Sequence, residues 1–301
     1  MRFLALIFAG LAASTLNWPG PAHSAPVQAK MAAEERLPHI SITTLGKGDP
    51  VVLIPGLSTP RAVWDGIAPE LARNHQVILV QVNGFAGDAP GANLAPGLLD
   101  GIIADLHLYI AAHRLGRVKL IGHSMGGLAA LKFARAHPEQ VDRVGVVDAL
   151  PFFAVLMDPN ATVDAVKPTA EMMRQKIAAA YGKPADPAAA EANVKSLALK
   201  PESIARMISW AAAADPRVTG EALFEDLTTD IRPGLSAIST PVTLIVPWSN
   251  SGFGEEQTLA FYKRQYAALP KVTFVGIADA GHFAMLDQPG SFAAAVDAFL
   301  R

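Results

Sequence analysis

The fold is decided by residues 118–130, which read VKLIGHSMGGLAA. A short apolar run ends at Ile121, a Gly-x-Ser-x-Gly turn follows, and the chain continues as an Ala- and Leu-rich helical pattern. Glycine at positions 122 and 126 leaves room for a bend that would crowd a Cβ atom against the neighbouring backbone. Without the strand and the helix, the same turn would suit any tight βα connection. Together they predict a nucleophile elbow that lifts Ser124 to the carboxyl edge of a parallel sheet.

Apolar runs on both sides of the elbow predict further strands of the same sheet. They are continuous rather than alternating, as expected of strands buried on both faces. Segments with helical spacing of apolar residues separate them, which predicts βαβ crossovers and a mostly parallel sheet. The expected strands are 39–45, 51–54, 77–82, 118–121, 141–147, 242–246 and 272–277, and the expected helices are 60–73, 98–114, 125–137, 255–269 and 289–300.

The alternation of strands and helices breaks between residues 151 and 240. This span holds no persuasive strand, but several Ala-, Met- and Leu-rich helical stretches separated by prolines such as Pro168 and Pro201. We interpret it as a helical cap inserted after the sixth strand of an α/β fold. The core of that fold is expected to consist of residues 26–150 and 241–301, with a mostly parallel central sheet flanked by helices.

The first 25 residues indicate a targeting segment rather than part of the fold. Arg2 is followed by an apolar run over residues 3–16 and by small residues at 22–25. This order is typical of a secretory signal peptide, and the run is shorter than the ~20 apolar residues that span a bilayer. An uncleaved membrane anchor is the alternative. We expect export, to a bacterial periplasm or beyond, and no stable membrane insertion after cleavage.

Composition excludes several function classes. The chain has 301 residues, of which 51% are hydrophobic and 17% charged, so it can form a large core and is not of the disordered class. The net charge is −2, and Lys and Arg form no stripe, so the sequence indicates no basic surface that would bind nucleic acid. The absence of cysteine removes disulfides, thiolate metal sites and cysteine nucleophiles.

A serine hydroxyl is a poor nucleophile until a base takes its proton, so the elbow needs a histidine. The chain has eight histidines, and His282 is the best candidate because it follows a predicted strand in a Gly-His loop. His123 adjoins the serine, but we expect its side chain to point away and to pack against neighbours. The nearby Asp287 is expected to cap the closing helix, 289–300.

The acid that orients the base is assigned to Asp148. This residue directly follows a predicted buried strand, and a carboxylate at that position can reach His282. The next strand, 242–246, is followed by no carboxylate until Glu255 and Glu256, which are the alternatives. A role for Asp148 as a simple turn or capping aspartate is the competing interpretation.

Acyl transfer also needs amide donors for the developing oxyanion and a pocket for the acyl group. The backbone amide of Met125, the residue after the serine, and that of Leu57, in the turn after strand 51–54, are predicted to supply the donors. The acyl pocket is expected to draw on nearby apolar side chains, although each of them taken singly also suits core packing. These candidates are Phe85, Phe152, Phe153, Leu156, Met157 and Trp248.

With these motifs in place, the chain resembles the α/β-hydrolase superfamily over residues 39–301, and is most similar to its capped, lipase- and esterase-like members. The resemblance rests on VVLIPGL at 51–57, GHSMGG at 122–127 and GHF at 281–283, and on the DIRP and ISTP segments before strand 242–246. Two departures are visible. The position where members commonly carry the acid is empty, which favours Asp148, and the turn after Val82 lacks the frequent Asp-x-x-Gly-x-Gly form.

The resemblance implies a serine hydrolase that cleaves carboxylic esters, lactones or thioesters through an acyl-enzyme intermediate. The expected partner is a small, apolar acyl substrate, and no metal or cofactor is required. Serine at the elbow argues against dehalogenase and epoxide hydrolase chemistry, which uses aspartate there. Hydrolysis of an amide, peptide or carbon–carbon bond, and a non-catalytic ligand-binding role on the same fold, remain the alternatives.

Overall fold

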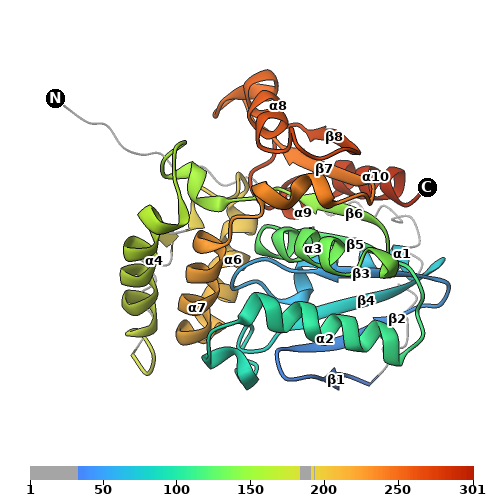
Figure 1. Cartoon of the computed structure of the whole chain (residues 1–301), viewed down its shortest axis with the longest axis horizontal. Coiled ribbons are helices and arrows are strands. Elements are labelled where there is room, and N and C mark those ends of the chain that lie inside the picture. Colours follow the sequence, from blue (N-terminus) through green and yellow to red (C-terminus); the bar gives the residue numbers. More distant parts are fainter. Residues whose placement is uncertain (1–32, 184–190, 193) are drawn as a thin grey trace, which may run out of the picture.

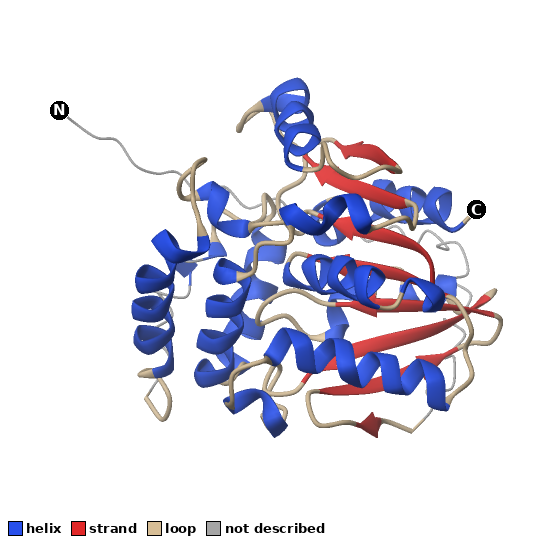
Figure 2. Cartoon of the chain, in the orientation of Figure 1, coloured by secondary structure: helices blue, strands red, loops and turns tan. Residues whose placement is uncertain are grey.

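The computed structural model describes residues 33–183, 191–192 and 194–301. A central sheet runs through this part of the chain, with helices on both of its faces (Figure 1 and Figure 2). The signal peptide predicted over residues 1–25 lies outside the described residues and stays a prediction. The strands are β1 (Glu35–Arg36), β2 (Ile40–Leu45), β3 (Asp49–Ile54), β4 (His75–Val82), β5 (Val118–His123), β6 (Val141–Val147), β7 (Val242–Pro247) and β8 (Val272–Ile277).

The sheet has the order β1-β2-β4-β3-β5-β6-β7-β8 in the described residues. β2 pairs antiparallel with β1 and β4, and every other neighbouring pair is parallel. The carboxyl ends of β3, β5, β6, β7 and β8 therefore share one edge, which is where open parallel sheets place their sites. The predicted fold class, an α/β-hydrolase fold with a mostly parallel sheet, is confirmed.

The apolar runs of the strands feed two separate cores. In β3, Val52 and Ile54 belong to one cluster of buried residues, while Val51 and Leu53 belong to the other, as the two-residue period of a strand requires. Helices α2 (Leu98–Ala112), α3 (Met125–Ala136) and α8 (Gly254–Gln265) contribute to the first cluster. Helices α1 (Ala68–Leu71), α9 (Ala284–Asp287) and α10 (Pro289–Leu300) contribute to the second.

The helix predicted over residues 60–73 forms as two short pieces instead. A 3-10 helix, η1 (Arg61–Trp64), is followed by a break at Ile67, whose φ of −125° is not helical, and then by the single turn of α1. Pro69 lies in the first turn of α1 and has no N–H to donate to the preceding turn. The apolar spacing of the segment is still met, because Val63, Trp64, Ile67 and Leu71 are all buried, as the prediction required.

The described residues between β6 and β7 include three long helices that lie to one side of the sheet (Figure 1). They are α4 (Val163–Ala178), α6 (Pro201–Ala213) and α7 (Pro216–Thr228), and α4 packs along α7. Contrary to the sequence prediction, α4 continues through Pro168. A proline at this place removes a single backbone hydrogen bond, and the contact with α7 holds the helix together. None of the described helices is both long and apolar enough to cross a membrane.

A glutamate of the segment between β6 and β7, which we call the cap, binds the core. Glu225 of α7 accepts hydrogen bonds from the amides of Gly97, Leu98 and Leu99, at 2.6, 2.7 and 2.8 Å. These amides belong to the first turn of α2, where backbone donors have no partner inside the helix and where a negative charge is favoured. Glu225 therefore caps α2 from a different part of the chain and fixes the position of α7 over the sheet.

We predict that Gly126→Ala destabilises the fold. A Cβ atom at this position would lie 2.4 Å from the carbonyl oxygen of Ile54 and 2.5 Å from that of Pro55. Both are backbone atoms that cannot move aside, so the clash outweighs the ~1 kcal/mol that alanine gains over glycine in a helix. The free energy of unfolding from urea titration should fall by about 1–3 kcal/mol. Gly66→Ala is the control, since a Cβ atom there meets nothing within 4 Å, and equal stability of the two variants would contradict the prediction.

Candidate active site

Ser124 has the strained backbone expected of the elbow. Its φ of 54° and ψ of −126° lie in a region that non-glycine residues rarely adopt. Hydrogen bonds hold it there, because its amide donates to the carbonyl of Val147 at 2.9 Å and its carbonyl accepts from Gly127 and Leu128. The serine is therefore fixed between the ends of β5 and β6, at the start of α3.

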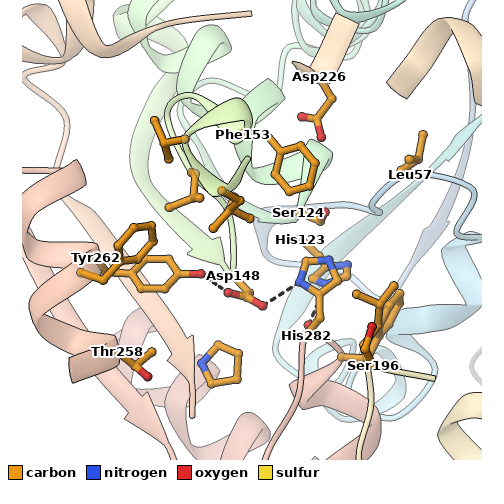
Figure 3. Close-up of a pocket in the computed structure, with 18 of the residues that line it drawn as sticks. Leu57, His123, Ser124, Asp148, Phe153, Ser196, Asp226, Thr258, Tyr262 and His282 are labelled. Atoms are coloured by element: carbon orange, nitrogen blue, oxygen red, sulfur yellow. Dashed lines mark hydrogen bonds and ion pairs between the residues drawn. The ribbon is translucent and has the colours of Figure 1, made fainter. Parts of the chain in front are cut away.

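Ser124 opens into a cavity of about 930 Å³ between the sheet edge and the cap. Figure 3 shows Ser124, Asp148 and His282 at this cavity, with Asp226 of α7 on the far side of the serine from His282 in that view. Apolar side chains dominate the remaining wall, and they come from the turn after β3, the segment after β6, the cap, α8 with the residue before it, and the residue after His282. They are Leu57, Leu150, Phe153, Val155, Leu156, Leu197, Leu223, Phe253, Phe261 and Phe283.

The structure joins His282 to Asp148. The His282 Nδ1 atom lies 2.6 Å from Asp148 Oδ2, and both side chains are largely buried, with exposed fractions of 23% and 15%. Asp148 directly follows β6 and has a φ of +45°, which is a strained conformation. The hydrogen bond that its backbone amide donates to the carbonyl of Ile245 holds it there. A hydrogen bond from Nδ1 to the Asp148 carboxylate places the proton of a neutral imidazole on Nδ1, so that the other ring nitrogen, Nε2, carries none.

The alternative acids lie elsewhere. Glu255 and Glu256 are exposed in the first turn of α8. Asp279 is exposed in the loop before His282. Among the described residues, none of the three makes a hydrogen bond to His282, which favours Asp148 as the partner of the imidazole.

Ser124 and His282 line the same cavity. Within the described residues, no hydrogen bond joins the Ser124 hydroxyl to an imidazole nitrogen. Catalytic contacts of this type are commonly long in a resting enzyme and tighten around the substrate. The structure thus brings the three predicted residues together and forms the histidine–aspartate half of the arrangement.

Asp148 has a second donor that the sequence did not reveal. The buried hydroxyl of Tyr262, from α8, donates to Asp148 Oδ1. Burial, followed by the charge of Asp148, raises the pKa of Tyr262 well above 10, so the phenol stays protonated. One helical turn later, the hydroxyl of Tyr266 donates to the carbonyl of Ala149 at 2.8 Å. The sequence feature that could have indicated these contacts is the i, i+4 spacing of the two tyrosines, which places them on one face of a predicted helix.

His123 supports His282 rather than the serine. Burial, and then the neighbouring His282, lower the pKa of His123 well below 6.5, so its ring is neutral. A neutral ring has a single N–H, and its Nε2 lies 2.9 Å from the backbone carbonyl oxygen of His282, so that nitrogen is the donor. The position of the catalytic candidate is thus fixed from both its side chain and its backbone.

The prediction that Asp287 caps the closing helix, 289–300, is wrong. Asp287 does not cap α10, whose N-cap residue is Gln288. It is fully buried instead, and its carboxylate accepts from the amides of Gly281, Leu199 and Lys200 at 2.9, 2.9 and 3.3 Å. It therefore connects the loop that carries His282 to the segment directly before α6, in the middle of the cap, a contact between segments about ninety residues apart in sequence.

The predicted oxyanion donors have free amides. Leu57 lies in the turn after β3, and Met125 is the first residue of α3. In the described part of the chain, neither amide donates to a protein acceptor. The start of α3 packs directly on the β3 turn, as the close approach of Gly126 to Ile54 and Pro55 shows. Both amides are thus available near Ser124, and Met125 also carries the positive end of the helix dipole.

The acyl-pocket prediction was mostly wrong. Phe153 lines the cavity, as does Leu156, but Phe85 and Phe152 are fully buried in the core. The guanidinium of Arg232 covers the ring of Phe152. Met157 is 53% exposed and lies outside the cavity wall.

Trp248 also lies outside the cavity wall. Its backbone bonds to Ile277 and Ala280, and its indole lies over Gly276 of β8. Apolar character identified these residues as buried or near the site, but it did not reveal which way each side chain points.

Comparisons with known proteins identify the family. The family model described as "Alpha/beta hydrolase family" matches residues 51–295. The chain belongs to the α/β-hydrolase family. It is 27% identical to the pimeloyl-[acyl-carrier protein] methyl ester esterase of Nitrosomonas europaea, over 86% of this chain and 98% of that protein. It is 32% identical to the 2-hydroxy-6-oxo-2,4-heptadienoate hydrolase of Pseudomonas putida, over 44% of this chain and 48% of that protein.

Other matches are shorter or structural. The pimeloyl-[acyl-carrier protein] methyl ester esterase of Aeromonas hydrophila is 35% identical, over 38% of this chain and 43% of that protein. The chain thus spans less than half the length of this relative and of the dienoate hydrolase. Among solved structures, a thermophilic esterase from Thermogutta terrifontis has a TM-score of 0.72 and 24% identity, covering 90% of this chain and 98% of that one. These findings support a hydrolase, and the structural likeness supports its fold.

We predict that Tyr262→Phe lowers the turnover of p-nitrophenyl acetate without unfolding the protein. The change removes the donor to Asp148 Oδ1 and leaves that oxygen buried, so Asp148 orients His282 less well. A hydrogen bond to a charged group contributes about 1.5–3 kcal/mol, so kcat for p-nitrophenyl acetate should fall by about tenfold or more, with a smaller change in KM. Tyr266→Phe is the control, because its hydroxyl bonds to a backbone carbonyl instead. Equal loss of kcat in both variants would contradict the assigned role.

Proposed function

We propose that this protein is a serine hydrolase that cleaves carboxylic esters through an acyl-enzyme intermediate. The observation that carries the proposal is the 2.6 Å hydrogen bond between His282 and Asp148 in the cavity that holds Ser124 on its strained turn. A base oriented by a carboxylate beside a strained, accessible serine is the arrangement that activates a hydroxyl.

In the proposed reaction, the Ser124 oxygen attacks the ester carbonyl while His282 Nε2 takes its proton. The amides of Leu57 and Met125 donate to the oxyanion, and Asp148 stabilises the imidazolium. The imidazolium then gives its proton to the leaving alcohol as the C–O bond breaks. A water molecule, deprotonated by His282, then attacks the acyl carbonyl. As the bond between the acyl carbon and Ser124 Oγ breaks, the imidazolium returns this proton to Oγ, which releases the carboxylic acid and restores the Ser124 hydroxyl.

The relatives and the apolar wall of the cavity support an ester as the group that is cleaved. The relatives named above include methyl ester esterases, and a structural neighbour is an enol-lactonase from Burkholderia xenovorans. The largely apolar cavity wall favours an apolar acyl or alcohol chain next to the reacting carbonyl. Carbon–carbon bond hydrolysis is the second candidate, because one relative carries the name of a dienoate hydrolase.

A substrate panel with three variants tests the proposal. The wild type should hydrolyse p-nitrophenyl esters of two to eight acyl carbons, and Ser124→Ala should abolish this activity. Asp148→Asn should lower kcat by about 10³-fold or more, since the neutral amide favours the wrong imidazole tautomer. Glu255→Gln is the matched control and should retain wild-type turnover. A protein that leaves every ester intact but cleaves a vinylogous 1,5-diketone would instead support the carbon–carbon hydrolase.

A further inference from the structure

The cap places over the site a buried carboxyl group that the proposed mechanism does not use. Asp226 lies in the last turn of α7, and only 6% of its surface is exposed. It lines the cavity together with Ser124 and Phe153. In Figure 3, its carboxylate points into the cavity toward these two residues, on the opposite side of Ser124 from His282.

Asp226 differs from the other buried carboxylates in having no partner among the described residues. Asp105 accepts from the amides of His39 and Ile40, and Asp287 accepts from three amides. Glu221, on the same helix, pairs with Arg174 at 3.2 Å. Buried polar groups are nearly always hydrogen-bonded, so an unpaired carboxyl that faces a cavity needs an explanation.

The arrangement costs stability. Burial raises the pKa of Asp226 from 3.8 to about 7, and the nearby His282 opposes this only in part. Its position in the last turn of α7 also sets a negative charge against the negative end of the helix dipole.

The charged groups of the elements packed on α7 do not compensate for this cost. Arg174 of α4 pairs with Glu171 and Glu221. Glu225 binds the first turn of α2. A residue that weakens the fold while facing the site is expected to serve binding or catalysis.

On the basis of the proposed ester hydrolysis, we propose that Asp226 is a specificity-determining residue that binds a protonated amino group of the substrate. An ionised carboxylate in a largely apolar cavity gains most from a ligand that brings both a hydrogen-bond donor and a positive charge. Leu223 and Phe153, which line the same cavity, suit the methylene chain that would link this ammonium to the ester.

The test compares esters that differ only at one chain end. Two series of hexanoate-sized esters carry a terminal ammonium, hydroxyl or methyl group, one series on the acyl chain and the other on the alcohol chain. At pH 8, where Asp226 is ionised, the wild type should prefer the ammonium ester over the methyl ester by about tenfold or more in kcat/KM, in at least one series. Asp226→Asn should lose this preference while keeping turnover of the methyl ester.

Glu221→Gln is the matched control, because it makes the same chemical change on the same helix, away from the cavity. It should keep the ammonium preference. The proposal is overturned if the wild type shows no ammonium preference in either series, if hydroxyl esters are preferred, or if Asp226→Asn leaves the preference unchanged. If none of the methyl esters is turned over, this result counts against the proposed function alone. The preference for the ammonium ester is then measured by calorimetric binding of the same esters.

Thermal stability supplies an independent readout. Because the pKa of Asp226 is higher in the folded than in the unfolded chain, the ionisation of this one group makes the fold less stable as pH rises from about 4 to 7. Asp226→Asn does not titrate, so its Tm should match the wild type near pH 4 and exceed it at pH 8. A lower Tm for Asp226→Asn at pH 8 would show that the carboxylate supports the fold, and would overturn the proposal.

Discussion

The structure depends on the close contact between the start of α3 and the ends of β3 and β5. A Cβ atom on Gly122 would lie 2.1 Å from the carbonyl oxygen of Gly126, and one on Gly126 would meet the backbone of Ile54. This contact requires glycine on both sides of Ser124 and forces the serine into its strained conformation. It also brings the Met125 amide and the Leu57 turn to the same place, so one steric constraint positions both the proposed nucleophile and its candidate oxyanion donors.

The second half of the site is held by a network of long-range bonds. His282 lies on a loop after the edge strand β8, which by itself would leave the imidazole poorly fixed. Asp148 binds its ring, and His123 binds its carbonyl. Asp287 accepts from the amide of Gly281, directly before His282, and from the amide of Leu199 in the middle of the cap. Since Asp287 contacts both the cap and the loop, a movement of the cap would shift the loop that carries His282.

The sequence predicted the parts of the molecule that follow from local pattern. Strands buried on both faces need continuous apolar runs, and the elbow needs its glycines, so the sheet and Ser124 could be located directly. Asp148 followed from the absence of an acid after strand 242–246. The contact of Tyr262 with Asp148, the place of Asp226 in the cavity wall and the true role of Asp287 could not be predicted, because each depends on segments that only the folded chain brings near one another. The pocket residues failed for a related reason: Phe152 and Phe153 are equally apolar neighbours, but only the latter faces the cavity.

The central claim is that Ser124 is activated by His282 and faces the amides of Leu57 and Met125. The most direct measurement is the crystal structure of the protein after reaction with a fluorophosphonate ester. We expect phosphorus bonded to Ser124 Oγ, and a phosphoryl oxygen within about 3 Å of both amide nitrogens, the distance that an oxyanion site requires. His282 Nε2 should lie within hydrogen-bond distance of Ser124 Oγ or the other ester oxygen. An unlabelled Ser124, or a phosphoryl oxygen that points away from these amides, would contradict the account.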